Sequence, residues 1–538
     1  KLKSYSKERS FMLRFFAVFI STLWLITSGC SPSQSSKGIF VVNMKEMPRS
    51  LDPGKTRLIA DQTLMRHLYE GLVEEHSQNG EIKPALAESY TISEDGTRYT
   101  FKIKNILWSN GDPLTAQDFV SSWKEILKED ASSVYLYAFL PIKNARAIFD
   151  DTESPENLGV RALDKRHLEI QLETPCAHFL HFLTLPIFFP VHETLRNYST
   201  SFEEMPITCG AFRPVSLEKG LRLHLEKNPM YHNKSRVKLH KIIVQFISNA
   251  NTAAILFKHK KLDWQGPPWG EPIPPEISAS LHQDDQLFSL PGASTTWLLF
   301  NIQKKPWNNA KLRKALSLAI DKDMLTKVVY QGLAEPTDHI LHPRLYPGTY
   351  PERKRQNERI LEAQQLFEEA LDELQMTRED LEKETLTFST FSFSYGRICQ
   401  MLREQWKKVL KFTIPIVGQE FFTIQKNFLE GNYSLTVNQW TAAFIDPMSY
   451  LMIFANPGGI SPYHLQDSHF QTLLIKITQE HKKHLRNQLI IEALDYLEHC
   501  HILEPLCHPN LRIALNKNIK NFNLFVRRTS DFRFIEKL

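Results

Sequence analysis

The sequence predicts an α/β protein whose two lobes face each other across a cleft. Its 538 residues exceed what a single hydrophobic core organises, and a prior of about 150 residues per domain suggests about three domains. An apolar content of 42%, with 11% aromatic residues, is typical of globular proteins. Strand and helix patterns alternate in two long halves of the chain, and this alternation favours two α/β lobes.

The first 29 residues have the pattern of an export signal. Basic residues precede a 12-residue, largely apolar run, Phe15–Ile26, which is too short to span a bilayer. Small residues and then Cys30 follow, and this ending resembles a bacterial lipoprotein box. The resemblance implies cleavage before Cys30 and acylation of that cysteine, for example with palmitate. An ordinary secretory signal with a coincidental cysteine is the alternative. We expect a signal peptide over residues 1–29, a lipid-anchored tether over 30–37, and a periplasmic protein of the bacterial cell envelope held to a membrane.

Charge and cysteine content argue against two classes of protein. The formal charge is +5, but residues 1–29 hold five basic residues against one acidic residue, so +1 remains after their removal. Bulk charge therefore gives no support to nucleic-acid binding. Five cysteines remain after Cys30, and this odd number without regular pairing argues against a disulfide framework. They are Cys176, Cys209, Cys399, Cys500 and Cys507.

The segment 84–123 combines a hairpin with a capped helix. Ser89–Ile92 and Arg98–Ile103 are short β-type runs, and the turn residues Glu94–Gly96 join them. Thr115 and Asp118 have the spacing of a helix N-terminal cap. The apolar residues that follow lie on one helical face, and they are Phe119, Trp123, Ile126 and Leu127.

The rest of the chain contains further strands and helices of both halves. The periodicity of apolar residues, the helix-capping residues, and the glycines and prolines that end helices and strands give their positions. The predicted strands are 38–42, 297–301, 386–391, 413–417 and 503–506, with a second hairpin at 158–172. The predicted helices are 62–69, 308–320, 321–332, 356–371, 399–410 and 487–497. No internal repeats are evident.

The order of residues in three blocks resembles the oligopeptide-binding proteins of bacterial ABC importers, solute-binding protein family 5 of the extracellular peptide-binding type. The blocks are Pro84–Tyr90, Asp95–Ile103 and Trp108–Phe119, and Phe300–Asp321 is a fourth match. The resemblance implies the two-lobed periplasmic-binding-protein fold with an extra third domain, discontinuous domains and hinge closure on a ligand. The implied domains are lobe I (38–63, 192–294 and 504–538), an extra domain packed on it (64–191) and lobe II (295–503).

The same resemblance implies how a ligand is held. The family typically places an aspartate of a Trp-x-x-Asp element on the α-ammonium group of the peptide, and basic residues on its carboxylate. Here the element begins at Trp440, and Ala443 takes the place of the aspartate. Apolar residues occupy the basic positions, namely Phe428, Leu429 and Val437. Asp446 matches a position that we expect to be structural.

The missing charges change the expected ligand. A buried ammonium group without a carboxylate costs several kcal/mol, so we expect free-ended peptides to bind weakly. Our hypothesis is a peptide with modified ends, such as a cell-wall-derived peptide. The candidate ligand-binding residues are Trp440, Thr441, Ala442, Ala443, Phe444, Trp297, Tyr135, Tyr137 and Met47. Ser294 and Thr441 occupy the positions of a cystine seen in some members.

Enzyme activity is not expected, because no phosphate loop, nucleophile elbow or paired zinc helix is present. His499, Cys500, His501, Cys507 and His508 lack the spacing of a metal site, so we expect neither metal nor cofactor. The expected partners are a peptide, ABC permease and ATPase subunits, and the membrane through the lipid on Cys30. We expect a monomer. The alternatives are an envelope lipoprotein or sensor without a transport role, and a binder of a non-peptide solute such as a metal chelate or haem.

Overall fold

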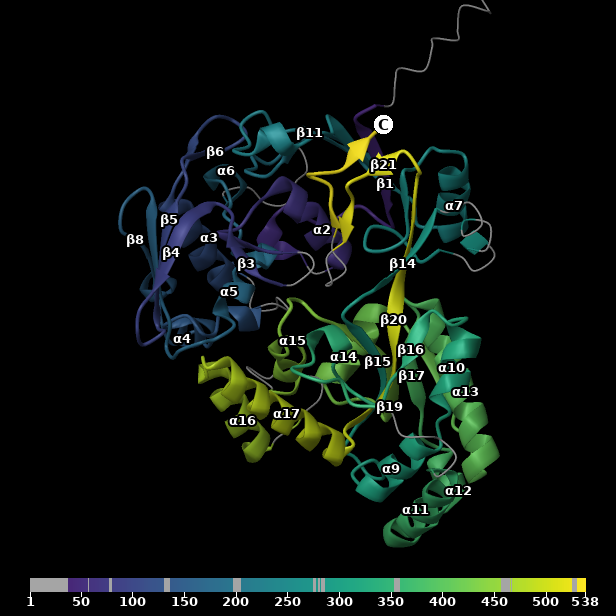
Figure 1. Ribbon diagram of the computed structural model, residues 1–538. Helices are drawn as coiled ribbons and strands as arrows, with labels where there is room; N and C mark the ends of the chain where they lie inside the picture. The colour runs from purple at the N-terminus through teal and green to yellow at the C-terminus, as the bar shows by residue number, and fades with distance from the viewer. Residues whose placement is uncertain are drawn as a thin grey trace, which may run out of the picture.

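The computed structural model describes residues 37–56, 58–76, 80–129, 136–196, 205–273, 277–278, 281, 286–352, 359–455, 465, 467–524 and 530–538. The predicted signal peptide and most of the tether, with Cys30, and also Tyr135 lie outside these residues. The predicted α/β fold with two lobes is confirmed (Figure 1). Among the described residues, no helix combines the length and the apolarity needed to cross a membrane.

We call the part drawn at the top of Figure 1 the upper lobe (residues 37–291 and 510–538) and the other part the lower lobe (294–509). The first sheet of the upper lobe has the order β1-β12-β11-β10. Its strands are β1 (Ile39–Met44), β12 (Lys241–Phe246), β11 (Arg222–Lys227) and β10 (Phe212–Glu218). Phe40 and Val42 alternate inward along β1 and are fully buried, so this face of the sheet forms core.

The second sheet of the upper lobe contains the predicted hairpin. It consists of β4 (Ala87–Ile92), β5 (Arg98–Ile103), β9 (His167–Gln171) and β8 (Val160–Ala162) in that order. The predicted helix is α3 (Ala116–Glu129), and the Asp118 carboxylate accepts the Thr115 N–H at 2.7 Å, as capping requires. Trp123 is fully buried and donates its indole N–H to the Phe188 carbonyl. Local signals therefore placed this hairpin and this helix correctly.

The lower lobe is a sheet covered by helices. Its strands are β15 (Ser294–Phe300), β19 (Leu435–Thr441), β17 (Leu386–Ser389) and β18 (Ile416–Gln419). Asn309 and Asp321 cap the first two helices through their side-chain oxygens, and the Asp321 cap was predicted. The longer helices are α9 (Ala310–Leu318), α10 (Lys322–Val329), α11 (Arg359–Leu374), α13 (Phe393–Leu410), α14 (Phe421–Leu429), α16 (Ser468–Gln479) and α17 (Lys483–Cys500).

One strand runs through both lobes. The first half of β20 (Leu503–Leu515) pairs with β15 and with β16 (Ala334–Pro336), and its second half pairs with β14 (Leu287–Pro291) and β13 (Trp264–Gln265). The chain also passes between the lobes from β14 to β15. Two adjacent connections of this kind suit a hinge, although the predicted domain boundaries stay a prediction.

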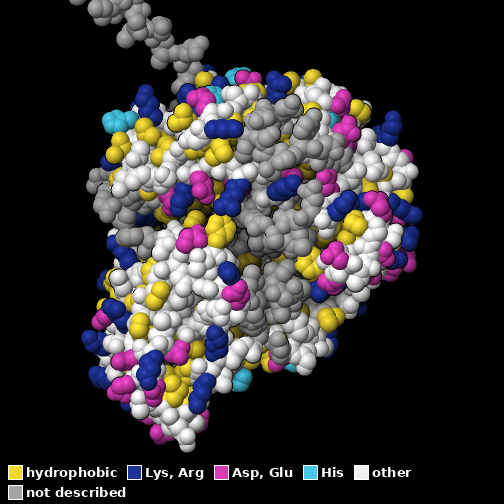
Figure 2. Space-filling model, turned by 180° about the vertical axis from the view of Figure 1, so that it is seen from behind, with side chains coloured by type: hydrophobic (Ala, Val, Ile, Leu, Met, Phe, Trp, Pro, Cys, Tyr) yellow, Lys and Arg dark blue, Asp and Glu magenta, His cyan; other side chains and the backbone are white. Residues whose placement is uncertain are grey.

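Shorter elements complete the described chain. In the upper lobe they are α2 (Ile59–Leu68), β2 (Val73–Glu75), β3 (Ile82–Pro84), β6 (Ile106–Leu107), β7 (Pro113–Leu114), α4 (Ala145–Phe149), α5 (Phe179–Phe182), α6 (Glu193–Arg196), α7 (Ala250–Lys258), β21 (Ile519–Lys520), β22 (Asn523–Leu524), β23 (Ser530–Asp531) and β24 (Glu536–Lys537). In the lower lobe they are α12 (Arg378–Leu381) and α15 (Met448–Leu451). Basic and acidic side chains are interspersed over the back face of the molecule (Figure 2).

Candidate ligand-binding site

The predicted site is built on the end of β19. The Trp440 indole donates to the Ser449 carbonyl at 2.7 Å, and the Ala443 N–H donates to the Ser449 hydroxyl at 2.7 Å. The Thr441 hydroxyl lies 2.8 Å from the Ser294 hydroxyl. These hydrogen bonds lie within the lower lobe, so they fix the loop 442–446 relative to its own sheet. A hydrogen bond joins the two positions where some family members carry a cystine.

Asp446 does not offer its charge to a ligand. Both terminal nitrogens of Arg486 donate to its carboxylate at 2.8 Å, and it also accepts the Met448 N–H at 2.9 Å. Burial raises the pKa of Asp446, but the Arg486 guanidinium outweighs burial and holds this pKa below its ordinary value. The expected structural role of Asp446 agrees with this geometry.

Phe444 contacts the upper lobe. Its side chain is fully buried, and its ring centroid lies 6.2 Å from that of His178, 5.8 Å from that of His181 and 5.3 Å from that of Phe182. Tyr137 joins this group, because its ring lies 6.0 Å from that of Phe182. The structure therefore brings together two predicted site residues, Phe444 and Tyr137, across the junction of the lobes.

The other predicted residues are dispersed. Trp297 is fully buried, and its ring lies at a steep angle to that of Tyr450, with the ring centroids 6.2 Å apart. Met47 lies half-buried on the loop after β1 in the upper lobe. Phe428 and Val437, which occupy the positions that the family resemblance assigns to basic residues, are each 1% exposed. The lower lobe thus presents no charged side chain at these two positions.

Glu75 is a residue of this region that sequence reasoning missed. It ends β2, and its side chain is 0% exposed. Its Oε1 accepts the Ile445 N–H at 2.8 Å and lies 3.0 Å from His181 Nδ1. An acidic side chain of the upper lobe therefore contacts the backbone of Ile445, which follows Ala443 by two residues. No local pattern reveals this contact, because it joins residues 370 positions apart.

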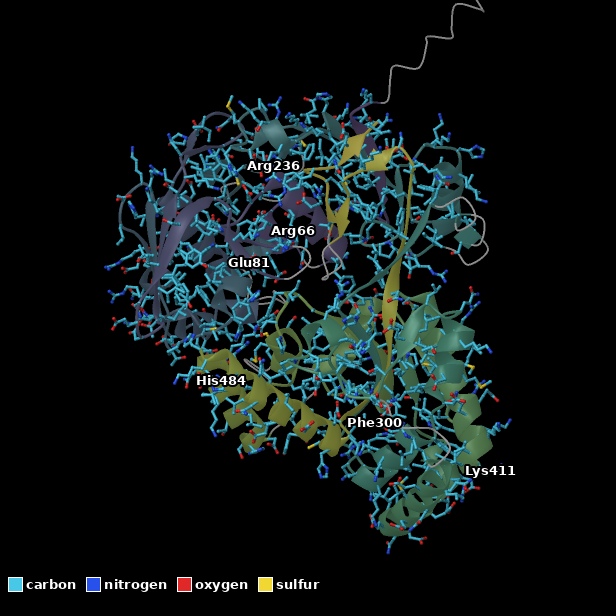
Figure 3. The ribbon with its side chains drawn as sticks, in the orientation of Figure 1. Arg66, Glu81, Arg236, Phe300, Lys411 and His484 are labelled. Carbon is cyan, nitrogen blue, oxygen red and sulfur yellow. The ribbon has the colours of Figure 1, made fainter. Side chains whose placement is uncertain are left out.

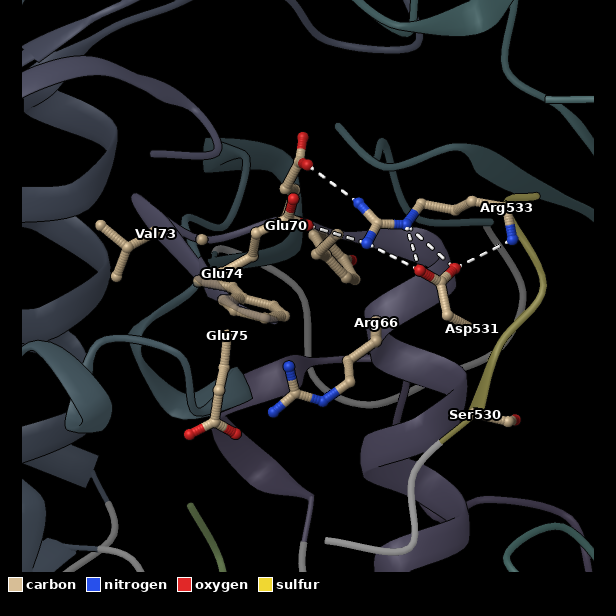
Figure 4. Close-up of a pocket in the computed structure, with 11 residues that line it drawn as sticks. Arg66, Glu70, Val73, Glu74, Glu75, Ser530, Asp531 and Arg533 are labelled. Carbon is tan, nitrogen blue, oxygen red and sulfur yellow. Dashed lines mark hydrogen bonds and ion pairs between the residues drawn. The ribbon is translucent and has the colours of Figure 1, made fainter. Parts of the chain in front are cut away.

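A pocket opens beside Glu75 in the upper lobe and encloses about 420 Å³, its mouth included. Figure 3 labels two residues of this part of the upper lobe, Arg66 and Glu81. The pocket lining consists of Arg66, Tyr69, Glu70, Gly71, Val73, Glu74, Glu75, Phe189, Ser530, Asp531 and Arg533 (Figure 4).

An internal charge network stabilises one wall of this pocket. Arg533 pairs with Glu70 at 3.2 Å, with Glu74 at 2.8 Å and with Asp531 at 2.8 Å. Burial raises the pKa of Asp531, yet Arg533 holds it below its ordinary value. Arg533 carries one positive charge against these three carboxylates, so the pairing fixes their positions but leaves this network with net negative charge.

A second set of contacts joins the lobes through cations and aromatic rings. Lys45 Nζ lies 4.8 Å from the centroid of the Phe391 ring, and the Arg49 guanidinium carbon lies 5.1 Å from that of Phe422. Phe391 and Phe422 are 51% and 47% exposed. Because both rings remain half in water, these contacts are weak compared with the buried contacts of Phe444.

The metal-capable residues of the C-terminal region do not gather into a site. His508 is 2% exposed, and its ring nitrogens lie 3.1 Å from the Thr295 hydroxyl and 2.9 Å from the Tyr350 hydroxyl. Within the described part of the chain, no group of three or more histidine, cysteine or acidic side chains is arranged to hold a metal ion.

Two lobes joined by paired crossing strands, with a loop of one lobe docked on the other, define a solute-binding protein. The family model described as bacterial extracellular solute-binding proteins, family 5 Middle, matches residues 81–462. The chain belongs to this family, and the predicted resemblance is confirmed.

Relatives match over most of their length. The oligopeptide-binding protein OppA of Bacillus subtilis is 29% identical over 84% of each chain. The probable deoxycholate-binding periplasmic protein YgiS of Escherichia coli is 28% identical over 85% of each chain. The structure of the Escherichia coli murein tripeptide binding protein MppA superposes with a TM-score of 0.80 and 25% identity, and covers 93% of this chain and 98% of that one. A periplasmic oligopeptide-binding protein of Borrelia burgdorferi has a TM-score of 0.81 and 27% identity over 93% and 100% of the two chains.

Proposed function

We propose that this protein is the solute-binding component of an ABC importer, which captures peptides between its lobes and delivers them to a membrane permease. The observation that carries the proposal is the match to peptide-binding relatives over nearly the whole chain, both lobes included. A binding protein of this kind needs no catalytic residue. The lobes supply the recognition, and their closure retains the ligand.

The geometry of β19 suits an extended peptide. Pairing of β19 with β17 ends at Val437, whereas its pairing with β15 continues to Thr441. Among the strands that the structure describes, none pairs with residues 438–441 on the side that β17 leaves. A peptide that added itself there as a strand would use its main chain, whatever its side chains. Trp440, Thr441, Ala442 and Ala443 would then lie beside it.

The masked-end hypothesis concerns the amino and carboxyl ends of the peptide. The masked-end hypothesis rests on the neutral side chain at Ala443, but Glu75 places a carboxylate in the same region. The hypothesis therefore stays a prediction. It requires that a tripeptide with an acetylated amino end and an amidated carboxyl end binds more tightly than the same tripeptide with free ends.

Titration calorimetry on protein purified without refolding tests both statements. The probes are an unmodified tripeptide, its acetylated and amidated counterpart, a murein tripeptide and, as a non-peptide solute, deoxycholate. Binding of any of the peptides supports the proposed function. Binding of deoxycholate alone overturns it in favour of a non-peptide solute. Sub-micromolar binding of the unmodified tripeptide contradicts masked ends.

We also propose that Cys30 is acylated and anchors a monomeric protein to the membrane on the periplasmic side. The export-signal pattern of residues 1–29 supports this proposal. Labelling of growing cells with a palmitate analogue tests it. Label is expected on the wild type and not on Cys30→Ser. An unlabelled wild type would leave residues 1–29 as an ordinary secretory signal.

A further inference from the structure

Among the described hydrogen bonds of the loop 442–446, the Ile445 N–H is the backbone donor whose acceptor belongs to the upper lobe. The Ala442 N–H donates to the Ala293 carbonyl at 2.8 Å, and the Ala443 N–H donates to Ser449. The Asp446 N–H donates to the Phe444 carbonyl at 3.0 Å. The Ile445 N–H instead donates to Glu75 of the upper lobe. Separation of the lobes therefore removes the acceptor of this one amide.

The surroundings of Glu75 fix its carboxylate at this place. His181 Nδ1 lies 3.0 Å from the same Oε1 that accepts the Ile445 N–H. The hairpin of β2 and β3 lies close to Ile445 at Gly80. Any larger residue there would clash, since its Cβ would lie 2.7 Å from the Ile445 Cβ. Gly80 has a φ of +72°, which glycine adopts without strain. The hairpin thus approaches the loop closely enough for Glu75 to reach it.

We propose that Glu75 is a positioning residue that couples closure of the lobes to the conformation of the ligand-binding loop. A carboxylate that accepts a backbone N–H in a dry environment forms one of the stronger hydrogen bonds in proteins. The bond joins the two lobes and would be lost if they separated, so it is expected to favour the arrangement seen here, which we take as closed, over a separated one by about tenfold.

Coupling of this kind has a consequence for affinity. When only the closed arrangement retains ligand, the apparent dissociation constant equals the intrinsic constant divided by the closed fraction. Loss of Glu75 then raises the apparent dissociation constants of all ligands by the same factor, so the order of the ligands by affinity stays unchanged. A residue that touched the ligand would alter the ranking instead, so affinities for two different peptides separate the two roles.

The test uses the ligand-free protein, so it does not depend on the proposed function. Hydrogen exchange measures protection of the Ile445 amide, and small-angle scattering measures the radius of gyration. Glu75→Ala is expected to speed exchange at Ile445 about tenfold and to enlarge the protein. Glu75→Gln keeps the size of the side chain and removes its charge, so an intermediate effect is expected. If the alanine variant fails to fold, the glutamine variant carries the test in its place.

Glu74→Ala is the matched control. Glu74 precedes Glu75 on the same strand, but its side chain is 43% exposed and pairs with Arg533. Its loss is expected to leave exchange at Ile445 unchanged. Wild-type exchange and radius in both Glu75 variants would overturn the proposal, as would an equal effect of Glu74→Ala.

Discussion

Arg486 holds Asp446 through two parallel hydrogen bonds, from Nη1 to Oδ2 and from Nη2 to Oδ1, each 2.8 Å long. Both side chains are nearly buried, with exposures of 13% and 10%. The pair ties the loop after β19 to α17, so the fixed shape of this loop depends on a charge pair that has little access to water. Removal of either partner leaves the other as an uncompensated charge.

The first prediction follows from this pair. Arg486→Leu is expected to lower the free energy of unfolding by about 3–5 kcal/mol, because it leaves the Asp446 carboxylate buried without a cation. Denaturation in urea measures the change. Lys383→Ala is the control, since Lys383 pairs with Asp380 at 74% and 37% exposure, and it is expected to change stability by less than about 0.5 kcal/mol. Equal losses in both variants would contradict the prediction.

The second prediction concerns pH. Burial lowers the pKa of His178 to about 3, with an opposing effect of Asp446 and a supporting effect of Arg486. In the unfolded chain His178 binds a proton near its ordinary pKa of 6.5. Between about pH 6.5 and 3 the unfolded chain therefore holds more protons at this histidine than the folded chain does. His178 therefore lowers stability as pH falls through this range, by about 1.4 kcal/mol per pH unit.

Stability measured at pH 7 and at pH 5 tests this sign. From pH 7 to pH 5 the wild type is expected to lose about 2 kcal/mol more than His178→Phe, which has no proton to bind. Other buried histidines titrate equally in both proteins, so the comparison isolates His178. The same loss in both proteins would show that His178 is not held neutral by burial.

The third prediction concerns the cation–aromatic contacts between the lobes. The Arg49 guanidinium lies 5.1 Å from the Phe422 ring, which is 47% exposed. A contact at such an exposed site contributes about 0.5–1 kcal/mol. A double-mutant cycle of Arg49→Ala and Phe422→Ala, with the closed fraction as readout, is expected to give a coupling of this size.

The control for this cycle lies within one lobe. Arg378 packs over Phe367 at 5.5 Å, and both residues belong to the lower lobe. Arg378→Ala is expected to leave the closed fraction unchanged, because the contact exists whether the lobes are open or closed. A coupling near zero for Arg49 and Phe422 would mean that their contact plays no part in closure.

Local signals predicted much of the fold. The turn Glu94–Gly96 and the pair Thr115 and Asp118 lie close together in sequence, so the hairpin and the start of α3 could be placed without tertiary information. The predicted strand 503–506 covers only the first part of β20, and Pro509, which has no N–H, makes the longer strand hard to predict from sequence. In the structure Pro509 lies opposite Ala334 and the strand continues to Leu515.

The site was less predictable, because its contacts join distant parts of the chain. Ala443 and Asp446 were interpreted from their place in a motif, and the pairing of Asp446 with Arg486 agrees with that interpretation. Phe444 was expected to line the cleft, yet its contacts with His178 and His181 depend on how the lobes meet. Glu75 carries no local pattern that distinguishes it from Glu74.

The fourth prediction tests the neutral position itself. Ala443 is half-buried, and its N–H is already used by Ser449, so a carboxylate can be added there without loss of that hydrogen bond. Ala443→Asp is expected to raise the affinity of an unmodified tripeptide at least about tenfold relative to its N-acetylated form, because only the free end carries an ammonium group. Ala443→Asn has the same shape without the charge and is expected to leave the ratio of the two affinities unchanged. Equal ratios in the two variants would show that the amino end of the peptide lies away from residue 443.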